Sequence, residues 1–428
     1  MATPLEFYKE EKLKKVKETE IGKIPKEWEV VRLEDLCERI KAGGTPSTSK
    51  REFWNGDIPF VKIEDITLAG KYLTNTKEKI SKLGLENSSA WIVPENSLLL
   101  AMYGSLGEVT INKIPAATNQ AILGIISSKC DVEFLYYWFL YFKPNWKRYA
   151  KPTTQANLTA EIVRNSKIPL PPLHEQRKIA HVLTTIDKAI EEVDKAIKKA
   201  ERIKKGLMQE LLTKGIGHKE FKDTEIGRIP KEWKVVRLGE LTKVTVGYVG
   251  KINEYYTTEN DGVPLLSTTN ISENGIRLDE IKYVSRGFHS KNKKSQVFSG
   301  DIIIARHGMS GTATTIPEFL KEAQCLNVVI VRSSREFYSK FVEYLFNFEP
   351  TRRRLLGWKS GSVQGVVNTK VLEKFKILLP PLPEQQKIAE ILSKWDRVIE
   401  LKKAKKEKLE RMKKKVMELL LTGKVRIK

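Results

Sequence analysis

The side chains best suited to chemistry in this sequence stand in short, mostly polar segments that follow apolar runs at matching places in its two halves. Arginine fits guanine, asparagine fits adenine, and a carboxylate accepts from the cytosine amino group in the major groove of DNA. The groups that differ between the halves are Lys62, Glu64 and Asp65 against Ser267, Thr269 and Asn270, and Met102 and Tyr103 against Arg306 and His307. These groups could therefore read two different short base sequences. The alternative is that exposed loop tips have simply drifted apart.

The complete set of candidate DNA-binding residues extends these groups to neighbouring basic and hydroxyl side chains. Lysine and arginine would hold phosphates, and the other side chains would reach base edges. The candidates are Lys41, Thr45, Ser47, Lys50, Arg51, Lys62, Glu64, Asp65, Tyr103 and Ser105 in the first half, and Ser267, Thr268, Thr269, Asn270, Arg306, His307 and Ser310 in the second.

The composition agrees with a polyanionic partner. The 428 residues include 76 Lys and Arg against 53 Asp and Glu, a net charge of +23. For a protein without a membrane anchor such a charge points first to nucleic acid or an acidic membrane surface, although part of it could be plain solvated lysine. No apolar run approaches the roughly 20 residues of a membrane helix, and the N-terminal residues lack a signal-peptide core. We expect a cytoplasmic protein that does not contact a membrane.

Catalytic and metal-binding motifs are missing from the sequence. The cysteines Cys37, Cys130 and Cys325 stand far apart without a CxxC pair, and the histidines are scattered. There is no Walker A loop, no glycine-rich cofactor loop, and no Asn-Pro-Pro-Tyr or Asp-Pro-Pro-Tyr loop of an amino-base methyltransferase. We expect no catalytic residue and no metal site. The alternatives are a single-chain DNA methyltransferase or nuclease with divergent motifs, and a coiled-coil clamp that binds nucleic acid without sequence preference.

An internal repeat organises the chain. Residues 14–36 match residues 219–241, including IGKIPKEWEVVRL and IGRIPKEWKVVRL, and KIPLPPLHEQRKIAHVL from Lys167 matches KILLPPLPEQQKIAEIL from Lys376. The chain is thus two tandem copies, each a variable body followed by a long charged segment.

The charged segments are predicted to be long helices. Apolar residues recur every seven positions from His174 to Leu212, as in a coiled-coil seam, and again from Glu384 to Leu421. The middle of the second segment, LKKAKKEKLERMKKK, is too basic to be fully buried. Each helix would span roughly 58 Å. The linker of about Lys214 to Lys222 is short, so antiparallel pairing is favoured, with an approximate two-fold relation between the copies.

Strand signals dominate the variable bodies. Ile58–Ile66 aligns with Val263–Ile271, and the runs LLLA and IIIA precede matching glycines, which indicates buried strands that lead into exposed loops. The aromatic stretch Phe134–Phe142 and its counterpart FVEYLFNF are predicted to be core helices rather than base-stacking platforms. The fold class is therefore α+β, with two mixed α/β domains separated by two long antiparallel helices that form a coiled-coil spacer.

The order of these motifs resembles one known family over nearly the whole chain. IGxIPxEWxVVRL, a variable body and LPPLxEQxKIA at the start of a long helix, repeated once and closed by LLTGK, is similar to the specificity (S) subunit of Type I restriction-modification systems. The resemblance implies a non-catalytic subunit whose two target-recognition domains each read half of a bipartite DNA site, while the helices set the gap. The implied boundaries are an N-terminal segment 1–17, domain 18–166, spacer helix 167–214, linker and domain 215–375, and spacer helix with tail 376–428.

The resemblance also implies partners and their cofactors. One such subunit joins two methyltransferase (M) subunits, and two restriction (R) subunits complete the nuclease; S-adenosylmethionine, ATP and Mg would belong to these partners. The positions that match the helix-opening motif would seat the methyltransferase subunits. They are Pro171, Pro172, Leu173, Glu175 and Gln176 in the first copy and Pro380, Pro381, Leu382, Glu384 and Gln385 in the second.

Overall fold

The computed structural model describes residues 16–146, 158–273, 275–307, 310–357 and 367–427. The chain divides into two compact units. Unit 1 comprises residues 1–194 and 405–428, and unit 2 comprises residues 195–404. No helix in the described ranges is long and apolar enough to cross a membrane.

In unit 1 the repeated thirteen-residue motif ties the body to its helix. It begins in the hairpin of β1 (Val16–Thr19) and β2 (Gly22–Pro25) and continues as β3 (Glu29–Arg32), which pairs antiparallel with β13 (Lys167–Leu170), directly before the first long helix. The indole of Trp28 is fully buried beneath these strands. The motif is therefore a structural joint that links the start of the body to the start of the helix.

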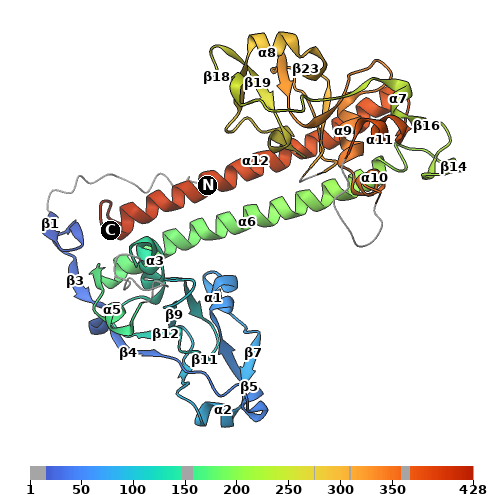
Figure 1. Ribbon diagram of the computed structural model, residues 1–428. Helices are drawn as coiled ribbons and strands as arrows, with labels where there is room; N and C mark the ends of the chain where they lie inside the picture. Colours follow the sequence, from blue (N-terminus) through green and yellow to red (C-terminus); the bar gives the residue numbers. More distant parts are fainter. Residues whose placement is uncertain (1–15, 147–157, 274, 308–309, 358–366, 428) are drawn as a thin grey trace. The chain divides into compact units, whose positions relative to one another are not determined.

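The body of unit 1 contains two sheets, in the orders β4-β12-β9-β10-β6 and β7-β5-β11-β8, with β5 parallel to β11 (Figure 1). The strands are β4 (Cys37–Ala42), β5 (Trp54–Val61), β6 (Tyr72–Leu73), β7 (Glu78–Ile80), β8 (Ile92–Val93), β9 (Leu98–Ala101), β10 (Val109–Asn112), β11 (Ala116–Thr118) and β12 (Ile122–Ser127). The helices are η2 (Leu33–Leu36), η3 (Arg51–Phe53), α1 (Ile63–Ala69), α2 (Lys82–Glu86), α3 (Val132–Phe142), η4 (Lys143–Asn145) and α5 (Ala160–Arg164).

Unit 2 repeats this plan. Its orders are β17-β27-β24-β25 and β18-β22-β19-β26-β23, and β19 runs parallel to β26. The strands are β14 (Phe221–Thr224), β15 (Gly227–Pro230), β16 (Lys234–Arg237), β17 (Val244–Val246), β18 (Tyr256–Thr257), β19 (Gly262–Leu266), β20 (Ile271–Ser272), β21 (Gly275–Ile276), β22 (Lys282–Ser285), β23 (Gln296–Phe298), β24 (Ile302–Ala305), β25 (Ala313–Thr315), β26 (Glu322–Cys325), β27 (Val328–Val331) and β28 (Lys376–Leu379). The helices are α7 (Leu238–Leu241), η5 (Asn253–Tyr255), η6 (Thr268–Asn270), α8 (Arg286–Lys291), η7 (Lys293–Ser295), α9 (Ser339–Asn347), α10 (Glu349–Leu355) and α11 (Thr369–Lys374).

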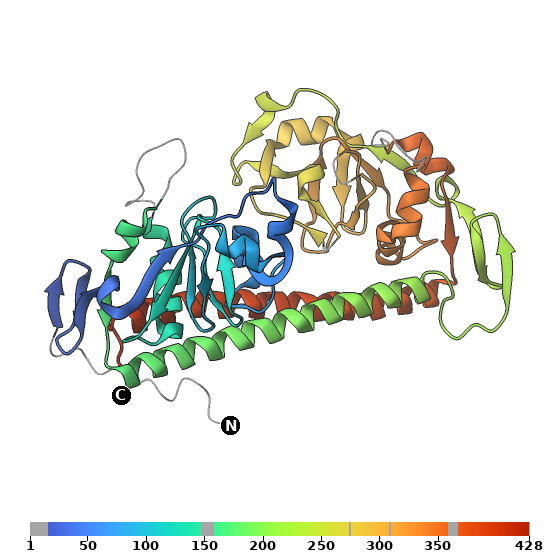
Figure 2. The ribbon, with the colours of Figure 1, turned by 90° about the horizontal axis from the view of Figure 1, so that it is seen from below.

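The joint of unit 1 recurs in unit 2. Strand β16 pairs antiparallel with β28, and the β14–β15 hairpin lies beyond the end of the first long helix (Figure 2). The predicted aromatic core helices are confirmed, because α3 and α9 each bury most of their side chains against the sheets. The apolar residues of these helices and of the strands on either side form the main core of each body.

The two long helices are α6 (Leu173–Leu211) and α12 (Leu382–Leu421), within two residues of the predicted bounds. Within unit 1, Lys413 pairs with Asp187 and Lys406 with Asp194, both at 2.6 Å. The numbers rise on α6 as they fall on α12, so the segments run antiparallel, as predicted. Within unit 2 the 2.5 Å pair between Lys204 and Asp396 fits the same direction.

The basic middle of α12 is open to solvent, as its composition predicted. No residue of this fully described helix is buried between Ile399 and Met417. In contrast, α6 has buried residues through its middle, with Ile186, Val193, Ile197 and Ala200 among them. In the middle of the two long helices, the buried apolar side chains therefore belong mainly to α6.

One local expectation was wrong. The apolar run from Ile58 ends β5 at Val61, as predicted, but the residues after it, which were expected to form an exposed loop, begin α1 at Ile63. The main-chain N–H of Lys62 donates to the Asp65 carboxylate at 2.8 Å, and the Asp65 N–H donates to the Lys62 carbonyl at 3.0 Å, so Asp65 caps the first turn of α1. A carboxylate in the first turn stabilises a helix, and this local signal explains why a helix forms where a loop was expected.

Candidate DNA-reading surfaces and the joints that support them

In unit 1 the structure brings most of the candidate residues into two neighbouring segments. The indole N–H of Trp54 donates to the carbonyl of Ser47 at 3.1 Å, and the ammonium of Lys62 lies 5.7 Å from the Trp54 ring centre. The loop before β5 and the start of α1 are thus joined through one tryptophan. Thr45, Ser47, Lys50 and Arg51 before β5 have exposed side chains, as does Lys41 near the end of β4.

The turn between β9 and β10 lies beside the same helix. A Cβ on Gly104 would come within 3.8 Å of the Ile63 side chain, and Gly104 has a positive φ of 63° that favours glycine. Tyr103 and Ser105 on this turn are half-buried. The two predicted groups of unit 1 therefore belong to one surface.

Some candidate side chains are engaged in local structure. Asp65 caps α1 and accepts a second bond from the Lys77 N–H at 3.1 Å, and Lys62 forms a 2.5 Å ion pair with Glu78. Glu64 is exposed and lies 3.8 Å from the ammonium of Lys77. Of these three side chains, Glu64 is the most accessible to a ligand.

In unit 2 the corresponding turn joins β24 to β25, and the loop after β19 lies near it. Arg352 of α10 forms a 2.5 Å ion pair with Glu273, next to that loop, and also lies beside Gly311 of the turn. The two ends of the turn are joined by the same backbone bond in both units: Gly107 N–H to Ala101 O and Gly311 N–H to Ala305 O, both 2.9 Å. One backbone frame thus presents different side chains.

The side chains of this surface differ in how freely they can be approached. His307 and Thr269 are exposed, and Nε of half-buried Arg306 has no hydrogen-bond partner among the described residues. Asn270 is buried; its amide accepts from the Ser267 N–H at 3.0 Å and donates to the Arg277 carbonyl at 3.0 Å. The remaining candidates, Ser267, Thr268 and Ser310, are half-buried.

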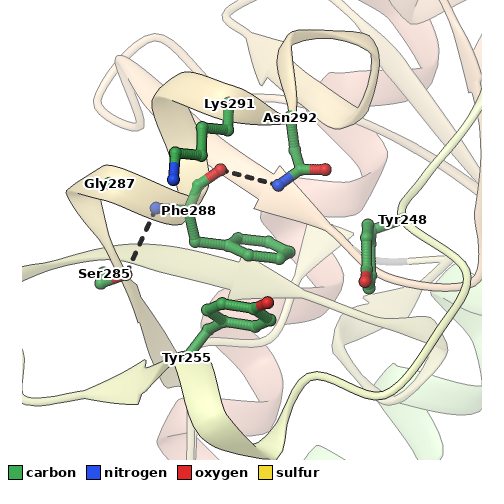
Figure 3. Close-up of a pocket in the computed structure, with 7 residues that line it drawn as sticks. All are labelled: Tyr248, Tyr255, Ser285, Gly287, Phe288, Lys291 and Asn292. Atoms are coloured by element: carbon green, nitrogen blue, oxygen red, sulfur yellow. Dashed lines mark hydrogen bonds between the residues drawn. The ribbon is translucent and has the colours of Figure 1, made fainter.

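A pocket of about 460 Å³ lies beside α8 in unit 2 (Figure 3). The rings of Tyr255 and Phe288 face each other with centres 4.5 Å apart, and Tyr248 meets Phe288 edge-on at 4.9 Å. The lining consists of Tyr248, Tyr255, Ser285, Gly287, Phe288, Lys291 and Asn292. None of the predicted reading residues lines it, so the pocket is separate from that surface.

The three cysteines of the chain are shielded from solvent to different degrees: Cys37 is half-buried, and Cys130 and Cys325 are buried. Burial raises the pKa of Cys37 to about 12, and burial also raises the pKa of Cys130 and Cys325. Thiols of this kind stay protonated and are poor nucleophiles. Within the described ranges no three His, Cys, Asp or Glu side chains come together as a metal site.

Each long helix begins in a polar seat that the sequence did not predict. In the first seat (Trp28, Glu175, Arg426 and Glu27) the buried Glu175 carboxylate accepts from the Trp28 indole at 3.1 Å and from two nitrogens of Arg426 at 2.6 and 2.8 Å. Arg426 also donates to Glu27 at 2.9 Å. These hydrogen bonds raise the pKa of Arg426, so the seat holds a permanent cation.

The second seat (Trp233, Glu384, His218 and Glu232) repeats this geometry with other donors. Glu384 accepts from the Trp233 indole at 3.0 Å, from His218 Nε2 at 2.9 Å and from the main-chain N–H of Ile216 at 2.9 Å. His218 Nδ1 lies 4.0 Å from Glu232. The glutamine after the glutamate in each helix-opening motif is also buried and bonds within its own unit. Gln176 accepts from Asp131 N–H at 2.9 Å, and Gln385 accepts from Tyr338 N–H at 2.8 Å.

Comparison with known proteins also divides the chain into two copies of one domain. The family model for the Type I restriction modification DNA specificity domain matches the chain twice, over residues 25–202 and 230–411. The chain belongs to this specificity family. The Type I restriction enzyme MjaVIII specificity subunit of Methanocaldococcus jannaschii is 32% identical, and the match covers 100% of this chain and 99% of that relative.

Two solved structures share the fold. A chain from work on complex assembly and conformational transition of the type I R-M system has a TM-score of 0.61 at 17% identity, covering 94% of this chain and 99% of that one. The type I S subunit from M. genitalium has a TM-score of 0.56 at 15% identity, covering 92% and 96%. Like its family, this specificity subunit is a non-catalytic DNA-recognition protein with two target-recognition domains, and a single-chain enzyme is not favoured.

The helix-opening motif of this specificity subunit has an inner and an outer face. Pro171, Glu175, Gln176, Pro380 and Gln385 are buried, and Glu384 is nearly so. The outer residues are Pro172 and Leu173 in the first copy and Pro381 and Leu382 in the second, and their exposed side chains are apolar.

Proposed function

We propose that this specificity subunit reads a bipartite DNA site, one half-site for each target-recognition domain. The observation that carries the proposal is the turn after β9 and after β24. Its ends are joined by the same backbone bond in both units, but it offers Tyr103 and Ser105 in one unit and Arg306 and His307 in the other. A constant frame with different tips suits the recognition of two different sequences. The domain limits predicted above, 18–166 and 215–375, remain part of this proposal.

Among the candidate residues, we assign direct base contacts first to five exposed side chains and to the half-buried Arg306, whose Nε has no hydrogen-bond partner among the described residues. These are Thr45, Ser47 and Glu64 in unit 1 and Thr269, Arg306 and His307 in unit 2, while Lys41, Lys50 and Arg51 would hold phosphates. Asp65 and Asn270 would act mainly by fixing the loops, because their polar atoms already bond within the domain.

The partners follow from the outer face of the two helix-opening motifs. Leu173 is 44% exposed and Leu382 is 39% exposed, each beside an exposed proline. Exposed apolar residues of this kind, repeated once per copy, would suit two methyltransferase subunits, and two restriction subunits would complete the nuclease. S-adenosylmethionine, ATP and Mg would then act on the partners, and the assembly would work in the cytoplasm, where it meets chromosomal DNA.

The central test is co-expression with the methyltransferase subunit of a related system, followed by genome-wide mapping of methylated adenine. We expect one split motif with a constant gap, and a continuous motif would contradict the proposal. Arg306→Ala should relax a single position of one half-site by about 1–3 kcal/mol of discrimination and leave the other half-site unchanged.

The docking surface has its own test. Leu173→Glu and Leu382→Glu should each weaken capture of the methyltransferase subunit, whereas Phe319→Glu, at an exposed apolar residue elsewhere in unit 2, should not. If all three variants captured the methyltransferase subunit equally well, the exposed leucines would not form its docking surface.

We also propose that the helices set the gap. Both α6 and α12 run without a break through residues of both units. Inserting one helical turn, about 5.4 Å, into both should lengthen the gap by about one or two base pairs. An unchanged motif in this variant would contradict a ruler role.

A further inference from the structure

A tyrosine of the core helix in unit 1 connects the body to both long helices. The hydroxyl of Tyr137 on α3 donates to the Asp187 carboxylate of α6 at 2.7 Å and contacts Thr184 at 3.2 Å. Lys413 of α12 pairs with the same Asp187 at 2.6 Å. We call Tyr137, Thr184, Asp187 and Lys413 the first junction.

Unit 2 contains the same arrangement, the second junction, made by Tyr344, Ser393, Asp396 and Lys204. The Tyr344 hydroxyl donates to Asp396 at 2.5 Å and lies 3.0 Å from the Ser393 hydroxyl, and Lys204 pairs with Asp396 at 2.5 Å. Here the tyrosine and the aspartate come from α9 and α12, and the lysine comes from α6. In each unit the junction thus links one body to its own long helix and to the other long helix.

The environment of the tyrosine is preserved even where the residues are not. In the first junction the ammonium groups of Lys71 and Lys413 lie 4.6 and 5.7 Å from the Tyr137 ring centre. In the second, Lys340 and Lys204 lie 5.1 and 5.5 Å from the Tyr344 ring centre. Lys71 precedes β6, whereas Lys340 belongs to α9 itself. Different elements therefore supply the same pair of cations around one ring.

The junctions are largely shielded from water. The side chains of Lys413 and Asp187 are 19% and 25% exposed, and those of Lys204 and Asp396 are 15% and 24% exposed. Burial raises the pKa of both tyrosines, so each hydroxyl keeps the proton that it donates. A shielded network of this kind can add little net stability, because desolvation opposes the attraction.

Attachment alone does not need these polar groups. On α6 the buried Ile179 and Leu183, and on α12 the buried Ile388 and Leu392, already belong to the apolar cores of their units. Apolar contact has no preferred direction, whereas a hydrogen bond to a carboxylate does. The polar groups therefore add orientation to an attachment that the apolar contacts already provide.

We propose that Tyr137, Asp187 and Lys413, and likewise Tyr344, Asp396 and Lys204, are positioning residues that fix the angle of each target-recognition domain on the long helices. By fixing that angle they restrict the subunit to one gap between its half-sites. This inference rests on the proposed bipartite reading. It assigns discrimination between gaps to the junctions and leaves recognition of each half-site to the loops.

The experiment uses the complex with methyltransferase subunits and two DNA duplexes, one with the native gap and one with a gap longer by one base pair. The ratio of the two dissociation constants measures discrimination. Lys413→Met and Lys204→Met should each reduce this ratio by about tenfold, the worth of one hydrogen-bonded interaction with a charged group. Lys413→Arg, which keeps the cation, should retain most of the ratio.

Matched controls separate position from charge. Lys414→Met and Lys205→Met remove the same charge one residue away, from exposed side chains, and should leave the ratio unchanged. Tyr137→Phe and Tyr344→Phe remove only a hydroxyl and serve if a lysine variant folds poorly. If a lysine variant kept the wild-type ratio of the two dissociation constants and lost only thermal stability, the positioning role would be overturned. A wild-type complex with no gap preference would instead contradict the proposed function.

Discussion

The two helix seats keep the same tryptophan and glutamate but complete them with different donors. In the first seat the Glu175 carboxylate is 1% exposed and depends on the guanidinium of Arg426. In the second seat Glu384 is 13% exposed and shares its charge between His218 and a main-chain N–H. The tryptophan and glutamate are thus the constant part of the joint, and the closing donor can change if the buried charge stays satisfied.

The segment that supplies the closing donor follows the same rule in both units. Arg426 lies just after α12, and His218 lies just after α6. Each segment approaches the tryptophan through a glycine with a φ of 68°, Gly423 or Gly215, where a Cβ would meet the indole at 3.2 or 2.8 Å. In each unit the start of one long helix is therefore locked by the residues that follow the other.

The largest expected effect is that of Arg426→Met. It leaves the buried Glu175 carboxylate with only the Trp28 indole among its present side-chain donors, and an uncompensated buried charge costs about 3–5 kcal/mol. Because the chain has two units, local stability is best measured by hydrogen exchange of the amides in β1 to β3.

The control for this prediction lies two residues away. Lys424→Met breaks a solvent-exposed pair with Glu418, and such pairs contribute little to stability because water and salt screen them. If both variants lowered protection of β1 to β3 equally, the first seat would not depend on its buried charge.

A smaller effect is expected for His218→Phe. The Trp233 indole and the Ile216 N–H continue to donate to Glu384, which is also partly reached by water, so the loss should be about 1–2 kcal/mol. Exchange of the β14 to β16 amides measures it, with Lys219→Met on the exposed neighbouring side chain as the control. A loss as large as that of Arg426→Met would show that the main-chain donor adds nothing.

The long helices and core helices could be predicted from the sequence because their signals are local and periodic. The seven-residue apolar repeat gave α6 and α12 within two residues of their ends, and the aromatic run gave α3. Helix α1 was missed, because the side-chain cap at Asp65 favours a helix where the polar residues after the apolar run indicated a loop. Local chemistry of this kind competes with periodicity and is hard to rank in advance.

The seats and junctions could not be predicted, because their partners are far apart in the chain. Glu175 and Arg426 are 251 residues apart, and nothing in the repeat marks Arg426 as the counterpart of His218. A signal for the junctions does exist. Asp187 and Asp396, and Lys204 and Lys413, are polar residues that recur at one constant offset within the helical repeat. The choice of reading residues has no such signal, since the two domains differ there.

The smallest expected effect is that of Arg426→Lys, which separates charge from shape in the first seat. Lysine keeps the cation but lacks the planar fork that donates from two nitrogens to Glu175 and from a third to Glu27. We expect a loss of about 1 kcal/mol in the exchange of β1 to β3, well below that of the methionine variant. Equal losses for the lysine and methionine variants would mean that the geometry of the guanidinium, and not its charge, satisfies the buried carboxylate. In that case the second seat, which has a histidine in place of the arginine, would depend mainly on its additional main-chain donor.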